Sequence, residues 1–434
     1  MRALVLAAAA AAAALLPGSP LGVGVPLVAL LVAAAAASAV RASPGPIVFG
    51  SLALALATLA AVRDAGWVVT LDLAAAWLLG SVAVAGPSLA AAAAPLLRLR
   101  DGATLAPHPP RGSAPVLRGA ALGGLVVVPF GALFWSADAA FAELGRGVPL
   151  PALGSVPGRA VAFCIVLAAA GGLVLAARRP LRPPTLAVPR RLSLWEWALP
   201  LALLAALFAV FVAVQIAVLF GGHEHVLRTA GLTYAEYARQ GFWQLLAAAG
   251  LTLTVVGGAV LFAAAPRRAD RLLLRVLLGI LCALTIVVLV SALRRLWLYE
   301  EAYGLTRLRL LAEAIAVWLG GTFALLLAAG LVARLRRRLA SVALAGTAVA
   351  LLAFSLLDPD GLVAERNVER WRDTGRIDLG YLRTLSADAA PELASLPPSL
   401  RGSALGPLRA ALADDEPWSS FNLSRRRARD LLDD

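Results

Sequence analysis

The sequence lacks lysine altogether, so its 39 basic residues are all arginines. Charged residues make up only 15% of the chain and aromatic residues 6%, whereas hydrophobic residues make up 60%, and the mean hydropathy is +0.82. So few charges could not cover the apolar interior of a soluble domain. The composition therefore excludes an ordinary soluble protein and predicts an all-α, multi-pass transmembrane helical bundle. The absence of lysine, with the excess of alanine, indicates compositional bias and carries no mechanism.

The sequence also lacks the motifs that several classes of function require. The two cysteines, Cys164 and Cys282, lie in apolar runs and have no metal-binding or redox spacing. No catalytic motif, nucleotide-binding loop or metal cage is present, so the sequence favours no enzyme class and predicts no cofactor. The formal charge of +13 does not indicate nucleic-acid binding, because the arginines cluster between apolar runs as they do in cytoplasmic loops.

Apolar runs of about twenty residues are long enough to cross a hydrocarbon core of roughly 30 Å as helices. About eleven such spans are predicted, at 3–17, 21–40, 46–62, 66–86, 115–135, 158–177, 195–219, 242–264, 270–292, 309–333 and 338–357. The first run is short and alanine-rich, so it is either a retained span or a signal sequence. The spans suggest three parts: alanine-rich spans in 1–112, a transmembrane core in 113–357, and a tail in 358–434.

Arginine clusters set the expected orientation, because cytoplasmic loops of membrane proteins are rich in basic residues. Every even-numbered span is followed by arginine, whereas the odd-numbered exits carry little charge or balance it with acids. The chain is therefore expected in the plasma (inner) membrane of a bacterium, with a cytoplasmic N-terminus and an extracytoplasmic tail. The basic residues concerned are Arg41, Arg98, Arg100, Arg111, Arg118, Arg178, Arg179, Arg182, Arg190, Arg191, Arg267, Arg268, Arg271, Arg275, Arg334, Arg336, Arg337 and Arg338.

The tail from Asp358 to Asp434 is the only sizeable water-soluble part. Its opening Asp-Pro-Asp-Gly predicts a turn, and the pattern from Leu362 to Trp371 predicts an amphipathic helix. A similar pattern covers 377–396, while Pro and Gly between 396 and 417 indicate a linker. So few aromatic residues make a poor independent core, so short helices docked on the outer face are expected, where a protein partner could bind.

Two polar stretches interrupt the apolar sequence on the predicted outer side. In the first, 221–243, His223, Glu224 and His225 could bind a metal, but residues two apart point to opposite sides of a helix. A solvated loop is the alternative. Further along the same stretch lie Tyr234, Glu236 and Arg239. These residues either cap the start of the next span and anchor it at the membrane surface, or they bind a polar ligand.

The second stretch, 291–311, makes the stronger case for a binding site. Its arginines lie on both sides of a predicted connection formed by residues 299–303, with Gly304 permitting a tight turn. Arginine forks suit phosphate and carboxylate groups, so an anionic lipid headgroup or acidic solute is one predicted ligand. The alternative is internal pairing with Glu300, Glu301 and Glu313. The candidate site residues are Arg294, Arg295, Tyr299, Glu300, Tyr303, Arg307 and Arg309.

Two acidic residues, Asp72 and Glu313, lie inside predicted spans. A charge in hydrocarbon costs about 2.5 to 3.5 kcal/mol, so each should face the bundle. Arg309, four residues before Glu313, is its expected partner. Asp72 has no local partner and is either a structural carboxylate or a proton-carrying group.

Four segments resemble a family of bacterial polytopic membrane proteins known as a domain of unknown function, of the 4173 type. They are LYEEAYGLTRLRL, TYAEYARQGFWQLL, FGALFWSADAAFAEL and ERNVERWRDTGRIDLGYLRTLSADAAPEL. The resemblance covers roughly 115–430 and implies location and architecture, but no activity, substrate or cofactor.

Three functions follow as alternatives. The first is a non-enzymatic envelope or signalling component with an outward-facing polar site. The second is a transporter for a small anion, based on the arginines and Asp72, although no inverted repeat is visible. The third is a transferase acting on a lipid-linked substrate, with Glu224 or Glu300 as the acting carboxylate.

Overall fold

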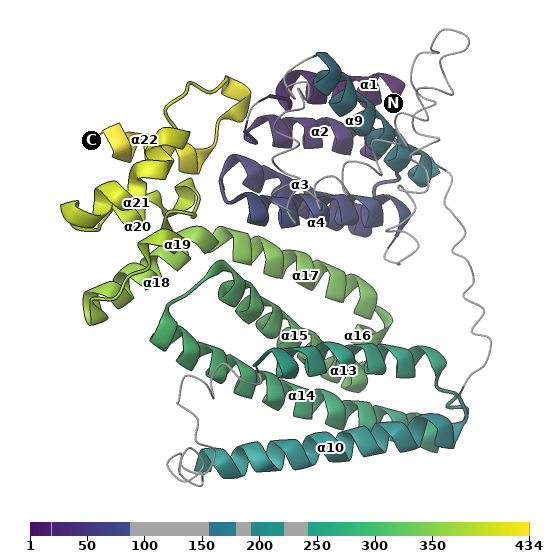
Figure 1. Cartoon of the computed structure of the whole chain (residues 1–434). Coiled ribbons are helices and arrows are strands. Elements are labelled where there is room, and N and C mark those ends of the chain that lie inside the picture. Colours follow the sequence, from purple (N-terminus) through teal and green to yellow (C-terminus); the bar gives the residue numbers. More distant parts are fainter. Residues whose placement is uncertain (19, 87–155, 179–191, 221–241, 434) are drawn as a thin grey trace. The chain divides into compact units, whose positions relative to one another are not determined.

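The structure is a computed structural model, and it describes all residues except 19, 87–155, 179–191, 221–241 and 434. Within these ranges the regular elements are helices, with one isolated bridge between Leu192 and Ala263. Among the described residues, eight helices are long and apolar enough to cross a membrane. The predicted spans at 3–17 and 21–40 overlap shorter apolar helices of 14 residues each, and 115–135 falls outside the described residues. The predicted helical membrane bundle is therefore confirmed (Figure 1).

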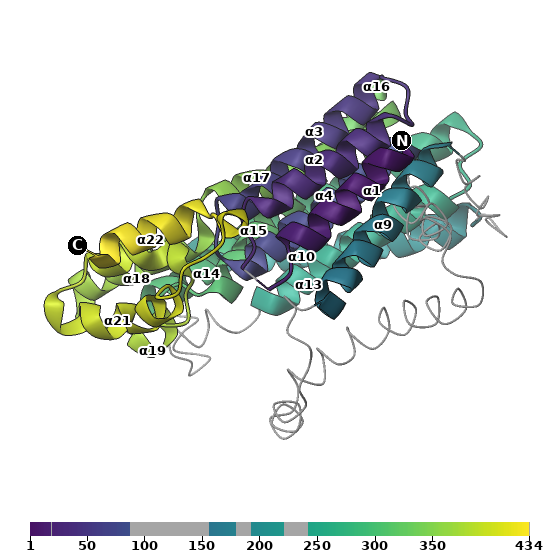
Figure 2. The same ribbon diagram turned by 90° about the horizontal axis from the view of Figure 1, so that it is seen from above.

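The chain divides into two compact units, residues 1–183 with 409–434 and residues 184–408. The three-part division expected from the sequence stays a prediction. In the first unit, α1 (Arg2–Leu15) packs against α2 (Gly24–Ala37) and α9 (Val156–Arg178), as Figure 2 shows. Small alanines let α1 and α9 approach closely, and Val5, Ala9 and Val174 are completely buried between them.

The remaining helices of the first unit form an antiparallel pair and a C-terminal segment. α3 (Pro44–Thr58) continues into the 3-10 turn η1 (Leu59–Ala61) and packs against α4 (Gly66–Ala85). The C-terminal segment comprises η4 (Trp418–Ser420) and α22 (Leu423–Asp433). It lies over the connection between η1 and α4, where its polar side chains bond to backbone carbonyls.

The second unit is organised around α14 (Arg268–Tyr303), which contacts three neighbouring helices. Its buried side chains, including Leu281 and Leu289, interlock with those of the neighbours. Many leucines and valines on the outer surfaces are exposed, such as Leu203 and Leu251, which suits helices whose solvent is lipid. The neighbours are α10 (Leu194–Phe220), α13 (Phe242–Phe262) and α15 (Arg307–Leu331) (Figure 1).

Beyond α15 the chain forms α16 (Ala333–Arg337) and α17 (Leu339–Leu356), and then leaves the apolar helices. The following short helices form what we call the helical cap, residues 358–396. It consists of α18 (Pro359–Thr374), α19 (Leu379–Leu382), η3 (Ala387–Ala389) and α20 (Ala390–Ala394). The helical cap has its own small core, in which Val363, Val368 and Leu393 are fully buried.

Two expectations for the tail are wrong. The sequence Asp358-Pro-Asp-Gly does not form a free turn, since Asp358 is the N-cap of α18 and its carboxylate accepts a bond from the Gly361 N–H at 3.2 Å. Proline at the first helical position is preorganised for this role. The expected linker between 396 and 417 instead contains the helix α21 (Pro398–Ala411), which buries Ala404, Leu405 and Leu408.

Candidate functional site

The connection between α14 and α15 is much shorter than the sequence predicts. Tyr299 and Tyr303 belong to the last turn of α14, because no helix-breaking residue precedes Gly304. Gly304 ends the helix with φ 81°, a backbone conformation that side chains rarely permit. Thr306 then caps α15 through a bond from the Arg309 N–H. The α14–α15 turn therefore consists of Gly304, Leu305 and Thr306, and the expected connection at 299–303 is wrong.

Arg307 binds the helical cap. Its Nε donates to Asp360 Oδ1 at 2.7 Å, and its Nη2 donates to the other carboxylate oxygen. The side chain of Asp360 is 0% exposed and that of Arg307 30% exposed. Asp360 also accepts the backbone N–H of Ser386 at 2.9 Å. Such a two-pronged, charge-assisted contact fixes orientation as well as distance.

Tyr381 of α19 also contacts Arg307. The backbone N–H of Arg307 donates to the Tyr381 hydroxyl at 2.7 Å. Burial raises the pKa of Tyr381, and the bond and charge of Arg307 partly oppose that rise. Tyr381 therefore stays neutral at physiological pH and accepts one of the N–H groups that the first turn of a helix leaves without an internal partner.

Two further side chains of α18 cover the end of α14. Asn367 Nδ2 donates to the carbonyl of Leu305 at 2.7 Å. Arg370 donates to the carbonyls of Glu301 at 3.3 Å and Ala302 at 2.6 Å. The last carbonyls of a helix need external donors, and a cation there also interacts favourably with the helix dipole. The helical cap thus satisfies both helix ends at the α14–α15 turn.

The expected pair between Arg309 and Glu313 does not form. Arg309 Nη1 donates to the carbonyl of Gly304, and its guanidinium lies 4.3 Å from the centre of the Tyr299 ring. Helical side chains lean toward the N-terminus, so an arginine in the first turn points back to the connection and away from a residue four positions later. The ring of Tyr299 in turn packs on that of Tyr303, with centroids 4.8 Å apart.

Glu300 lies in a small cluster of charges beside this turn. The groups that act on it electrostatically are Glu313, Arg309 and Arg366 of α18. One carboxylate oxygen of Glu300 is buried without a hydrogen bond among the described residues. The acidic residues of the same hairpin do not neutralise the charge of Arg307. The partner of Arg307 comes from the helical cap instead.

The remaining predicted site residues lie earlier in α14, in the first unit or outside the described residues. Arg294 is exposed on the surface of α14, and Arg295 is half-buried. Asp72 is completely buried in α4, in the other unit. Among the described residues no group of acids, histidines or cysteines could hold a metal ion. The first polar stretch lies outside the described residues, including His223, Glu224, His225, Tyr234, Glu236 and Arg239.

Sequence reasoning missed the residues that hold the helical cap. Asp360, Asn367 and Tyr381 lie 53 to 74 positions from the residues they contact. One local signal did exist, because the Asp-Pro pair before α18 is typical of a helix start and places Asp360 in the first turn. No local pattern, however, identifies a partner so far away in the chain.

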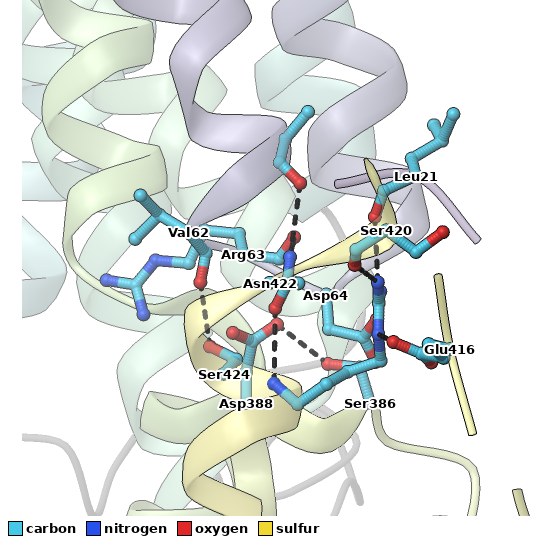
Figure 3. A network of polar contacts seen from close by, with 12 residues as sticks. Leu21, Val62, Arg63, Asp64, Ser386, Asp388, Glu416, Ser420, Asn422 and Ser424 are labelled. Carbon is cyan, nitrogen blue, oxygen red and sulfur yellow. Dashed lines mark hydrogen bonds and ion pairs between the residues drawn. The ribbon is translucent and has the colours of Figure 1, made fainter. Parts of the chain in front are cut away.

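A second polar centre lies in the first unit, around Arg425 of α22. Its side chain is 6% exposed and pairs with Asp64 at 2.6 Å and with Glu416 at 3.1 Å. It also donates to the carbonyl of Leu21 at 3.0 Å. Figure 3 shows the neighbouring Asn422 directed at backbone carbonyls of the connection between η1 and α4, at 2.8 Å from that of Arg63. The arrangement fixes the C-terminal segment to the helix ends of this unit.

Comparison with known proteins identifies the family of this chain. A family model described as a domain of unknown function (DUF4153) matches residues 3–396. The resemblance stated above is corrected in two ways: the family is not of the 4173 type, and its match begins at residue 3, so the first spans belong to it. No curated protein and no solved structure matches the chain.

Proposed function

Because the chain belongs to the DUF4153 family, whose description names no activity, we propose a function from the geometry of the helical cap. The protein is a non-enzymatic component of a bacterial plasma membrane, and it holds the helical cap outside the cell membrane as a binding surface for a protein partner. The transmembrane helices of the second unit serve as the platform, and the α14–α15 turn is the attachment point.

The single observation that carries this proposal is the contact of Arg307 with Asp360. Arg307, for which the sequence left open a free anion or an acidic residue of the same hairpin, is bound to a buried carboxylate of the helical cap. The turn is therefore better suited to hold a rigid extramembrane structure than to bind and release a small solute. A rigid surface binds a partner with a smaller loss of entropy than a flexible one.

The orientation is supported by the placement of charge within the second unit. Leu192, just before α10, bonds to Phe262 at the end of α13, so these two helices run antiparallel. The connections α13–α14 and α15–α17 lie at the end of α14 and α15 opposite the helical cap. That end of the two helices carries the basic residues Arg267, Arg268, Arg271, Arg275, Arg334, Arg336, Arg337 and Arg338. By the positive-inside rule, that end faces the cytoplasm and the helical cap faces outward.

Photo-crosslinking in intact cells tests the proposal. A photoreactive amino acid is placed at Asp373 or Arg383, both exposed on the helical cap. We expect a discrete protein adduct from these positions, and its loss when Asp360→Ala releases the helical cap. Adducts with lipid only, or protein adducts that Asp360→Ala leaves unchanged, would contradict the proposed binding surface.

A transporter is the second candidate, and the burial of Asp72 favours it. A carboxylate completely buried within a candidate span is the kind of group that proton-coupled transporters use. Purified protein in proteoliposomes separates the two functions. Anion uptake driven by a pH gradient and lost in Asp72→Asn would establish the transporter, whereas the proposed binding protein gives no such flux.

A further inference from the structure

The C-terminal segment lies at the level where two candidate spans meet. Asn422 Nδ2 donates to the carbonyl of Ala60 at 3.1 Å, and Ser424 Oγ donates to that of Val62 at 2.9 Å. Ala60 lies in the last turn of Pro44–Ala61, and Val62 lies in the connection from there to Gly66–Ala85; both helices are long enough to cross a bilayer. A connection between two spans marks a membrane boundary, so the segment fixed to it lies at that boundary.

Two aromatic rings of this segment are exposed. Trp418 is 66% exposed and Phe421 51% exposed, although Ser419 and Ser420 between them are buried. The backbone holds the rings in place, since the carbonyl of Phe421 accepts the Val23 N–H at 2.9 Å. Two large rings left in water forgo the stabilisation that burial of apolar surface provides.

We propose that the C-terminal segment is a membrane-interface anchor. Trp418 and Phe421 insert into the headgroup layer of the bilayer around the first unit, and Arg426 and Arg427 bind the lipid phosphates. Aromatic rings are enriched at this depth because one part of the interface is apolar and the other is wet. The anchor adds a lipid contact to a chain that already spans the membrane.

The surrounding charges favour lipid as the occupant. Arg426 and Arg427 are both exposed. Arg426 pairs only across one helical turn with Asp430, and both of those side chains are more than half exposed. Such a surface pair contributes little, so a phosphate can compete for the arginine. The nearby acid Glu416 is already engaged by Arg425 and Arg429 at 3.1 and 3.3 Å, and does not oppose a phosphate with a free charge.

This inference does not depend on the proposed function. It concerns the first unit, whereas the helical cap belongs to the second, and it holds whichever side of the membrane the C-terminus occupies. A surface hollow at the segment is lined by both aromatic rings and by Arg426, and also by the acidic residues Asp415 and Glu416. The rings and Arg426 offer a headgroup an apolar and a cationic contact there.

Depth-dependent fluorescence quenching tests the anchor on the full chain in lipid nanodiscs. Cys164→Ala and Cys282→Ala remove the native thiols, and an environment-sensitive fluorophore is attached at Trp418→Cys or Phe421→Cys. Asp414→Cys, also exposed, is the matched control. We expect lipids spin-labelled near the headgroup to quench the first two positions at least about twofold more strongly than the control.

Three outcomes decide the proposal. Emission typical of water at positions 418 and 421, with quenching equal to that at 414, overturns it. A blue-shifted emission that spin-labelled lipid does not quench also overturns it, because protein then covers the rings. If quenching at 418 is unchanged in Arg426→Gln with Arg427→Gln, the phosphate contact is refuted. Should the label at 418 prevent folding, the label at 421 gives the same measurement.

Discussion

The contact between Arg307 and Asp360 gives the most direct test of how the helical cap is held. Asp360→Ala removes a fully buried carboxylate that binds both Arg307 and the Ser386 N–H. Breaking a buried ion pair by removing one partner costs about 3 to 5 kcal/mol. Because Arg307 is 30% exposed and water can reach it, the lower end of that range applies, about 3 kcal/mol.

Hydrogen exchange measures this loss of stability as a faster exchange rate of the backbone amides. Amide protons of the helical cap exchange through local opening, and about 3 kcal/mol corresponds to a roughly 100-fold faster exchange across residues 359–396. Exchange in the middle of α14 should stay unchanged. Mass spectrometry of the intact protein in nanodiscs, followed by proteolysis, gives both values in one experiment.

A matched pair on the same helix provides the control. Arg366 and Glu369 lie 3.5 Å apart with side chains 63% and 49% exposed. An exposed pair contributes about 0 to 1 kcal/mol, so Glu369→Gln should change exchange only a few-fold. Equal exchange in Asp360→Ala and the parent protein, or an equal effect of Glu369→Gln, would refute the reasoning.

Three other predictions concern Arg425, Tyr381 and the orientation of the chain. Arg425→Ala should cost about 3 to 5 kcal/mol and expose residues 417–433 to limited proteolysis, whereas Arg427→Ala should not. Tyr381→Phe should cost about 1 kcal/mol by hydrogen exchange. Because the pKa of Tyr381 is raised in the folded state, its contribution is present below about pH 10 and falls as pH rises further, a loss that the phenylalanine variant should lack. A periplasmic reporter fused after Asp434 should be active, and one inserted within residues 178–191 should be silent.

The helices could be predicted from the sequence because the bilayer imposes a length. A run such as 242–264 must be about twenty residues long and apolar, and the structure gives Phe242–Phe262. Outside the spans, the amphipathic helix expected from Leu362 to Trp371 is confirmed, since it lies within α18, but the expected linker is wrong. Pro and Gly between 396 and 417 indicated a linker, but Leu405 and Leu408 bury an apolar face and stabilise α21 despite Pro407.

The candidate site was located by sequence, but its partners were not. The polar stretch 291–311 does contain the α14–α15 turn, because charges concentrate where a helix leaves the membrane. Pairing by spacing assigned Arg309 to Glu313, and it left Arg307 either to an acidic residue of the same hairpin or to a ligand. The structure shows Arg307 bound to Asp360, 53 residues later. Contacts over such separations depend on how helices return to one another, which spacing along a single helix does not encode.

Gly304 offers a last test, since it joins the sequence signature AYGLT to the docking of the helical cap. Its φ of 81° is strained for any residue with a side chain, and a Cβ there would collide with the amide of Asn367. Gly304→Ala should therefore cost about 1 to 3 kcal/mol and accelerate exchange in the helical cap. Gly320→Ala in α15, where a Cβ meets open space, is the control and should be neutral or slightly stabilising. Asn367→Ala alone also loses the bond to the Leu305 carbonyl, so it is the reference for the double variant with Gly304→Ala. A double variant less perturbed than the sum of the two single variants indicates the collision, and additive effects indicate backbone strain. Exchange in Gly304→Ala equal to that in Gly320→Ala would show that the turn does not position the helical cap.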